Sequence, residues 1–149
     1  MAQAFKLRRA ALRDMWNVFR LSNDPYVREN SLHPELISKA THASWFLSAI
    51  NSEDIMFYIA ESCEGEFIGQ VRFRFQDNAW ITSISLVEKY RGQHMSCDIL
   101  KGAMQKSKLG VFQAFIKLNN IASIRLFEKA GFRSVPSTQS QLLKMTAIC

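Results

Sequence analysis

One junction constrains the fold of this chain more than any other: residues 86–96, LVEKYRGQHMS, followed directly by DILKGAMQKSK. An apolar run ends in a short basic turn, and a helical pattern begins immediately after it. Such a strand–turn–helix corner directs several unpaired backbone N–H groups, and the positive end of a helix dipole, at one point. The corner therefore predicts a site for a diphosphate or another compact anion. It lacks the glycine spacing of a nucleotide P-loop and the GxGxxG of a dinucleotide fingerprint.

The charge of the chain also favours an anionic ligand. Lys and Arg outnumber Asp and Glu by 19 to 13, which gives a net charge of +6. Basic residues concentrate in residues 5–28 and 89–108, and such fields attract anions. There is no polybasic run, zinc-finger pattern or ribonucleoprotein signature. A phosphate-bearing small molecule is therefore favoured over nucleic acid.

The length of 149 residues, 48% of them apolar, predicts one domain over residues 1–149. The longest apolar runs are far shorter than the roughly 20 residues of a membrane helix, so no membrane partner is expected. The three Cys and three His residues lack metal-ligand spacing, which predicts no metal, reduced thiols and a cytoplasmic location. The basic N-terminus is interpreted as a strand and an amphipathic helix, with a transit peptide as the alternative.

The hydrophobic pattern predicts a mixed α/β (α+β) fold. We expect strands at residues 5–8, 55–62, 67–75, 79–87, 111–118, 132–135 and 142–148, the last two joined by the polar loop 136–141. We expect helices at residues 14–21, capped by Asp14, then at 38–50, from about 95 to near 110, and at 120–130. The third helix should bury Met95, Ile99, Leu100, Ala103 and Met104. Asn23-Asp24-Pro25 is expected to break the helical structure, because proline disfavours helix in the residue before it. Residues 26–36 are expected to be irregular, and Asp77-Asn78 to form a hairpin turn.

Two blocks of the sequence resemble the GNAT superfamily of acyl-CoA-dependent N-acetyltransferases, and the likeness extends over essentially the whole chain. Residues 86–96 resemble the family's acetyl-CoA turn, a basic or Gln residue followed by xxGxG or xxGxA. Residues 120–132, NIASIRLFEKAGF, resemble its NxxSxxLYxKxGF helix. The resemblance implies the GNAT fold, with a mixed sheet of about seven strands, about four helices, and a splay between strands 4 and 5.

A third stretch, residues 15–46, resembles a subgroup that acetylates nucleotide-linked deoxyaminosugars, the precursors of nonulosonic acids. It resembles the ribosomal-protein N-terminal acetyltransferases less closely. The likeness implies a small-molecule amine, a nucleotide sugar, as the partner. The sequence leaves a homodimer open.

The resemblance also implies which residues bind acetyl-CoA, the expected co-substrate. The pantetheine arm would lie along the fourth strand, with the N–H of Leu86 facing the thioester oxygen, and the pyrophosphate would lie in the turn. The implied residues are Ile84, Leu86, Val87, Arg91, Gly92, Gln93, His94, Met95, Ser96, Asn120 and Phe127. For Ile84 and Leu86 a core role, and for Asn120 a pure helix cap, are the alternatives.

The sequence departs from the family pattern at three of these positions. His94 and Ser96 replace glycines, and Phe127 replaces a Tyr that protonates the leaving thiolate in many relatives. The general base is unassigned, with His33 and Glu61 as weak candidates. The candidates for acceptor binding are Asn23, Arg28, Ser31 and His33, although Arg28 and His33 could equally be solvated loop residues.

The predicted function is direct acetyl transfer from acetyl-CoA to an amine, with a nucleotide-linked aminosugar as the acceptor. The first alternative is a peptide or protein α-amine, for which Glu29 and Glu35 would line the acceptor groove. The second is an acyl-CoA-binding domain without turnover, motivated by His94, Ser96 and Phe127.

Overall fold

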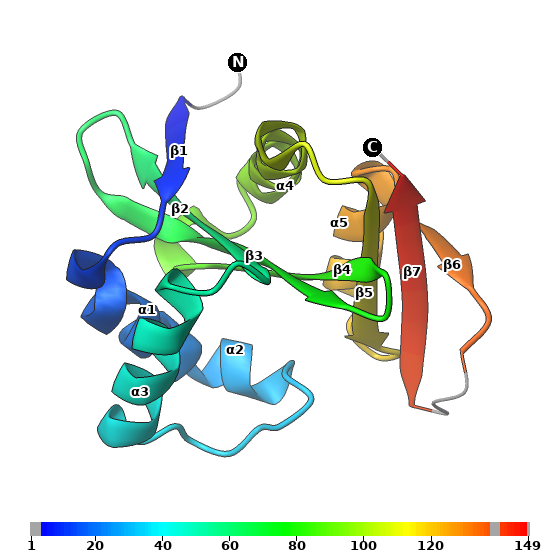
Figure 1. The fold of residues 1–149 in the computed structure, drawn as a ribbon. Helices are drawn as coiled ribbons and strands as arrows, with labels where there is room; N and C mark the ends of the chain where they lie inside the picture. Colours follow the sequence, from blue (N-terminus) through cyan, green and yellow to red (C-terminus); the bar gives the residue numbers. More distant parts are fainter. Residues whose placement is uncertain (1–3, 138–140, 149) are drawn as a thin grey trace.

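The computed structural model describes residues 4–137 and 141–148, and Figure 1 shows how its elements are arranged. Within these residues seven strands form one sheet in the order β1-β2-β3-β4-β5-β7-β6, antiparallel throughout except for the parallel pair β4–β5. The strands are β1 (Phe5–Arg9), β2 (Ile55–Ser62), β3 (Phe67–Gln76), β4 (Ala79–Leu86), β5 (Val111–Lys117), β6 (Arg133–Val135) and β7 (Leu142–Ile148). The predicted mixed fold with a seven-stranded sheet is confirmed.

Helices cover both faces of the sheet (Figure 1). The described residues form α1 (Met15–Ser22), α2 (Pro25–Glu29), α3 (Lys39–Ile50), α4 (Met95–Ser107) and α5 (Ile121–Lys129), with short 3-10 helices η1 (Leu12–Asp14) and η2 (Glu88–Tyr90). On one face α1 and α3 bury Phe46 against Phe57 of β2. On the other, α4 and α5 pack on a larger core that includes Ile99 and Phe112. The sheet therefore separates two cores.

Local sequence signals explain most of these boundaries. Ser38 caps α3 by accepting a hydrogen bond from the N–H of Thr41 at 3.1 Å. The turn between β3 and β4 places Asp77 and Asn78 at φ of 53° and 63°, which Asp and Asn tolerate better than most residues. The predicted inner face of α4 is confirmed, because all five of its predicted apolar residues are buried.

The sequence predicted an irregular segment over residues 26–36, and this is wrong in part, because α2 forms at Pro25–Glu29. The Oδ1 atom of Asp24 accepts hydrogen bonds from the N–H groups of Tyr26, at 2.9 Å, and Val27, at 3.4 Å. Proline suits the first position of a helix, where its missing N–H costs nothing. Asp24 and Pro25, which were predicted to break the helical structure, therefore start a helix.

The prediction that Asp14 caps α1 is wrong, because its side chain makes no capping hydrogen bond there. Its buried carboxylate accepts two hydrogen bonds from Arg8, both at 2.8 Å, and one from the N–H of Ala11. Burial raises the pKa of Asp14, but these hydrogen bonds outweigh burial and hold the pKa below its usual value. The carboxylate thereby ties the end of β1 to the start of α1.

His42 joins α3 to α1 inside the smaller core. Its Nε2 lies 2.8 Å from the carbonyl oxygen of Met15, so this nitrogen carries the proton and donates. The ring packs among Trp16, Phe19 and Trp45, with centroids 5.2 to 6.4 Å away. Burial lowers the pKa of His42 below its ordinary value. The neutral imidazole is therefore the form that this core accommodates.

Some expectations fall outside the described ranges. The loop 136–141 is described only at residues 136, 137 and 141, and Cys149 is not described. Cys63 and Cys97 are free thiols. Across residues 4–137 and 141–148, no helix combines the length and the hydrophobicity that crossing a bilayer requires.

Candidate functional site

The sheet opens where β4 and β5 diverge (Figure 1). The two strands pair only at Trp80–Phe112 and Ile81–Gln113, so residues 82–86 of β4 have no partner on β5. On its other side β4 remains paired with β3 along its whole length. The predicted splay between the fourth and fifth strands is therefore confirmed.

The backbone of β4 directs free polar groups into this opening. The N–H of Val87 donates to the carbonyl of Ile68 at 2.9 Å, which fixes the hydrogen-bonding phase of the β3–β4 ladder. Because that phase alternates along the strand, the N–H groups of Ile84 and Leu86 point away from β3, towards the side of β5. Val87 differs from them, since its N–H is already engaged. Two of the three predicted strand residues thus offer main-chain donors.

Close contact with β3 holds this end of β4. Gly69 lies opposite Leu86, and a Cβ atom at Gly69 would lie 2.3 Å from the carbonyl oxygen of Ser85 and 2.9 Å from the Cα of Leu86. Only glycine permits this approach. Beside it, the side-chain amide of Gln70 donates to the Ser85 hydroxyl at 2.9 Å.

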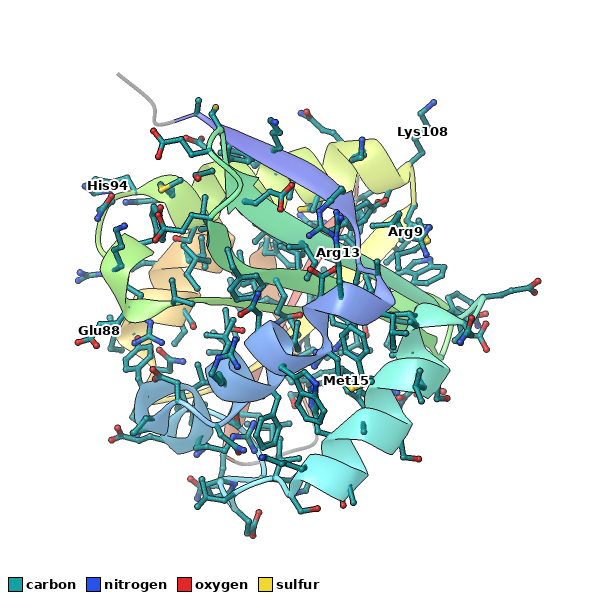
Figure 2. All side chains as sticks on the ribbon, turned by 90° about the vertical axis from the view of Figure 1, so that its left-hand side faces the viewer. Arg9, Arg13, Met15, Glu88, His94 and Lys108 are labelled. Carbon is teal, nitrogen blue, oxygen red and sulfur yellow. The ribbon has the colours of Figure 1, made fainter. Side chains whose placement is uncertain are left out.

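The turn after η2 presents a second group of backbone donors. Gly92 and His94 both have positive φ, 74° and 62°, and α4 begins immediately after His94. His94 makes no side-chain cap, so the N–H groups of Met95, Ser96 and Cys97, in the first turn of α4, lack intrahelical partners. Figure 2 shows His94 at the outer edge of the molecule, on the loop before α4. The corner therefore presents free backbone donors at the place where the sequence predicts an anion site.

Side chains from the turn brace its backbone. The amide of Gln93 donates to the carbonyl of Lys89 at 2.6 Å, and the ammonium of Lys89 bonds both carboxylate oxygens of Glu66, at 2.8 and 3.0 Å. Gln93 thus uses its side chain within the turn and leaves only its backbone to a ligand.

Arg91 faces away from the helix terminus, towards α2. Its Nε donates to the carbonyl of Leu86 at 2.9 Å, and its Nη2 lies 3.1 Å from Oδ1 of Asp24. The guanidinium also stacks on the ring of Tyr26, 4.7 Å from the centroid. This charge is therefore already paired, and Arg91 joins the turn to α2.

The two predicted residues of the last helix have structural roles. Asn120 caps α5, as predicted, by accepting a hydrogen bond from the N–H of Ser123 at 3.2 Å, and its amide donates to the hydroxyl of the same residue. Phe127 is 4% exposed and packs edge-to-face on Phe132, with centroids 4.9 Å apart. A phenyl ring there has no proton to donate.

The candidate acceptor residues of the α2 region mostly bond to their own loop. The amide of Asn23 pairs with both backbone groups of Ile37, each at 2.8 Å. Arg28 donates to three backbone carbonyls and to the hydroxyl of Ser31. Ser31 in turn donates to Val27. These residues shape the loop, and Arg28 brings to it a positive charge that has no ion-pair partner in the described part of the chain.

The two weak candidates for a general base are not brought together. His33 is exposed in the loop after α2, where its carbonyl accepts from Arg28. Glu61 lies on β2, two strands away from β4, and its carboxylate is 3.2 Å from the guanidinium of Arg8. Glu61 is therefore an ion-pair partner of Arg8, and its position does not suit a base at the opening.

Arg72 of β3 is not among the site residues predicted from the sequence. Its guanidinium stacks on Trp45, 4.7 Å from the ring centroid, and among the described residues its side chain donates one hydrogen bond, to Gln70 at 3.4 Å. Burial, and then the charges of Arg74 and Arg28, lower its pKa to about 10, so it stays protonated at neutral pH. The sequence signal for Arg72 is the alternation of apolar and polar residues in β3, which places arginine on the polar face of that strand.

The sequence was compared with protein-family models and with curated proteins, and the fold with solved structures. A family model described as the acetyltransferase (GNAT) domain matches residues 5–133. No curated protein matches the sequence. Within the described residues, no group of three His, Cys, Asp or Glu side chains is placed to hold a metal ion.

Solved structures with the same fold cover nearly all of the chain. The spermidine N-acetyltransferase of Vibrio cholerae, in complex with CoA and spermine, has 15% identity and a TM-score of 0.84, covering 97% of this chain and 95% of its own. An aminoglycoside acetyltransferase in complex with coenzyme A and kanamycin has 18% identity and a TM-score of 0.78, covering 97% and 95%. A protein provisionally named phosphinothricin N-acetyltransferase has 22% identity and a TM-score of 0.77, covering 97% and 98%. At these identities the likeness establishes a shared fold.

Proposed function

The chain belongs to the GNAT acetyltransferase family, and on this premise we propose that its acceptor is the amino group of a nucleotide-linked deoxyaminosugar. It is an acetyl-CoA-dependent N-acetyltransferase. Transfer is direct, within a ternary complex of enzyme, acetyl-CoA and amine. The observation that carries the transferase function is the coincidence of two sets of free backbone donors, on β4 and at the start of α4.

The residues of the corner suit the two ends of acetyl-CoA. The amides around Gly92 and at the start of α4 suit the pyrophosphate, because they and the helix dipole favour a doubly charged anion. The opening beside Ile84 and Leu86 suits the pantetheine arm, which is itself an extended chain with amide groups. Ser96 is small and adds a hydroxyl where the family has glycine. His94 adopts the left-handed conformation that a glycine would take.

The N–H of Leu86 is the group we assign to the reacting carbonyl. Acetyl-CoA supplies an acetyl group activated as a thioester, and negative charge develops on its oxygen as the amine attacks. A fixed backbone donor stabilises this charge, and the loss of one such donor raises a barrier by about 3–4 kcal/mol. The carbonyl of the same residue is held by Arg91, and Gly69 lets β3 approach closely from behind. Leu86 is therefore held from two sides.

Proton transfer relies on solvent in this proposal. Phe127 is buried and cannot protonate the leaving thiolate, so water takes that role. The side chains of β4 that face α1–α3 beyond Ile81 are Ser83 and Ser85, and neither titrates near neutral pH. The amine therefore loses its proton to water before it attacks. We expect slower turnover than in relatives with a tyrosine in this helix.

The charge of the chain supports an acceptor with phosphates. Residues 5–28 contain six basic residues and two acidic ones, and the helix α2 that they lead into carries Arg28 with no ion-pair partner among the described residues. A peptide α-amine acceptor would favour carboxylates at the groove. Glu29 and Glu35 are both exposed, and neither forms an ion pair within the described part of the chain.

The test is an assay for free coenzyme A with acetyl-CoA and three classes of amine: UDP-linked 4-amino sugars, peptides with free α-amines, and polyamines. We expect turnover on the sugar nucleotides. Turnover on peptides alone would refute the acceptor. Acetyl-CoA binding without turnover on any amine would favour the non-catalytic alternative. The variant Gly92→Val, which should not bind acetyl-CoA, serves as the background control.

A further inference from the structure

The face of the sheet beneath α1–α3 carries only positive charge from β3 to β6. Strands β3, β4, β5, β7 and β6 contain no Asp or Glu. Cross-strand partners share a face, so the pairings place every basic residue of these strands on the same side as Ser83. These residues are Arg72, Arg74, Lys117, Arg133 and Lys144. The opposite side is the apolar core under α4 and α5.

The residues of α2 approach the same face. The ammonium of Lys117 donates to the carbonyl of Glu29 at 2.8 Å, which joins the end of β5 to α2. Arg28 of α2 is close enough to Arg72 for its charge to act on it. The region between α2 and the open edge of β4 is therefore lined by cations from both sides.

Two part-buried arginines of the described residues, Arg72 and Arg28, form no ion pair, but Arg28 donates to three backbone carbonyls and to the Ser31 hydroxyl, whereas Arg72 has far fewer partners. Arg8 pairs with Asp14, and Arg91 pairs with Asp24. Among the ion pairs of the described residues none involves Arg72, which is held by the faces of Trp45 and Phe57 and by one long hydrogen bond. A guanidinium has five donors. Removing a charged guanidinium from water, even in part, costs free energy when no anion compensates it, and Arg72 is half-buried. Its free donors suit a ligand oxygen.

The strand register relates Arg72 to the reacting centre. Arg72 lies opposite Ser83, three residues before Leu86, which is about 10 Å along β4 at ~3.3 Å per residue. Ser85 lies between them on the same face. An acceptor with its amine near Leu86 would therefore reach Arg72 with a group several bonds away. A diphosphate attached to an aminosugar satisfies this separation.

We propose that Arg72 is a specificity-determining residue that binds a phosphate group of the acceptor, and that the cationic face excludes polycationic amines. This inference rests on the proposed transferase function and adds the group that the acceptor must carry. The guanidinium matches phosphate through paired hydrogen bonds, which a lysine cannot reproduce. Polyamines would meet only like charges from the strands of this face. Spermine and kanamycin, present in two of the similar structures, belong to the excluded class.

A binding experiment tests this without relying on turnover. The protein is saturated with coenzyme A, so that the corner is filled, and is then titrated with UDP or spermidine in a calorimeter. We expect UDP to bind the wild type, to bind Arg72→Gln at least tenfold more weakly, and to bind Arg72→Lys with intermediate affinity. Lys106→Gln, at the exposed end of α4, removes the same charge far from this face and should not change UDP affinity. Equal UDP affinity in wild type and Arg72→Gln, or spermidine competing with UDP, would overturn the proposal.

Kinetics separate this inference from the proposed function. For a UDP-linked aminosugar, Arg72→Gln should raise KM at least tenfold and change kcat much less, while the same sugar without its nucleotide should show no such dependence. Preferential acetylation of spermidine by the wild type would sustain the transferase and refute the role of Arg72. Absence of turnover on every amine, with UDP binding still dependent on Arg72, would refute the transferase and leave the phosphate site supported. Thermal melting of each variant shows whether it is folded.

Discussion

The substitution Gly69→Ala tests how β3 positions the end of β4 that we propose to hold the reacting carbonyl. The added Cβ would lie 2.3 Å from the carbonyl oxygen of Ser85, whereas ordinary contacts begin near 3.4 Å. The clash is with backbone atoms, so no change of rotamer relieves it. The two strands must therefore separate locally by roughly 1 Å, and Leu86, whose Cα is 2.9 Å from the same Cβ, moves with them.

This displacement has consequences for both activity and stability. A misplacement of about 1 Å at a reacting centre typically costs around 100-fold in rate. Overpacking of a tight contact typically costs about 1–3 kcal/mol, which corresponds to a fall in Tm of roughly 3–10 °C for a protein of this size. We expect kcat to fall by about two orders of magnitude, with a smaller change in the KM for acetyl-CoA, because the phosphate corner is untouched.

The assay is release of free coenzyme A under saturating acetyl-CoA, with thermal melting in parallel. Gly110→Ala is the matched control, since a Cβ there meets no atom within 4 Å and the residue has an ordinary φ. If Gly69→Ala melts lower but keeps kcat within twofold of the wild type, Leu86 does not provide the catalytic donor. If neither quantity changes, the close approach of the strands is itself refuted.

Four further substitutions test other parts of the structure. Gly92→Val places a β-branched residue at a φ of 74° and should abolish acetyl-CoA binding in calorimetry. His94→Gly removes strain at a φ of 62° and should preserve or tighten acetyl-CoA binding. Intact binding by Gly92→Val would refute the assignment of this turn to the pyrophosphate. Burial lowers the pKa of His42, so the unfolded chain takes up a proton at a higher pH than the folded protein does. Stability that is present above about pH 6.5 is therefore lost below it, by at most about 1.4 kcal/mol per pH unit. In urea unfolding, the free energy of unfolding should fall less between pH 7.5 and pH 5.5 in His42→Gln than in the wild type. Arg8→Met leaves the buried carboxylate of Asp14 without its cation and should cost about 3 kcal/mol in urea unfolding, and an unchanged midpoint would show that the pair is energetically neutral.

The sequence predicted the strands well because their signals are local. Alternation in residues 67–75 and the turn at Asp77-Asn78 indicate a hairpin without reference to the rest of the chain. The buried face of α4 follows from helical periodicity in the same way. The junction between strand and helix was equally readable, since it requires only that one element end where the next begins.

The errors arose where a side chain had two available partners. Asp14 stands at a position suited to capping α1, but Arg8, six residues earlier, offers a stronger, charge-assisted bond. Asp24 was interpreted as part of a break, yet its carboxylate both caps α2 and pairs with Arg91, 67 residues along the chain from it. Local patterns do not decide between such partners, because the second partner arrives only when the sheet assembles.

The cationic face was hidden for a related reason. Each basic residue of β3, β5, β6 and β7 is unremarkable in its own strand, and only the register shows that all of them share one side. The absence of carboxylates from five consecutive strands was visible in the sequence. It becomes informative once the pairing of β4 with β5 places Lys117 and Arg72 on the same side of the sheet.

If the corner binds a pyrophosphate as we propose, Arg91 helps to explain how it does so without the two family glycines. Its guanidinium is neutralised by Asp24 and bonded to Leu86, so the positive potential at the turn arises mainly from backbone N–H groups and the dipole of α4. A backbone donor is present in every residue except proline, and a side chain matters only where it prevents the required φ. His94 reaches that φ at modest cost, and Ser96 is already helical, where glycine has no advantage. We therefore expect anion binding at this corner to depend on the path of the chain, which Arg91 fixes between β4 and α2.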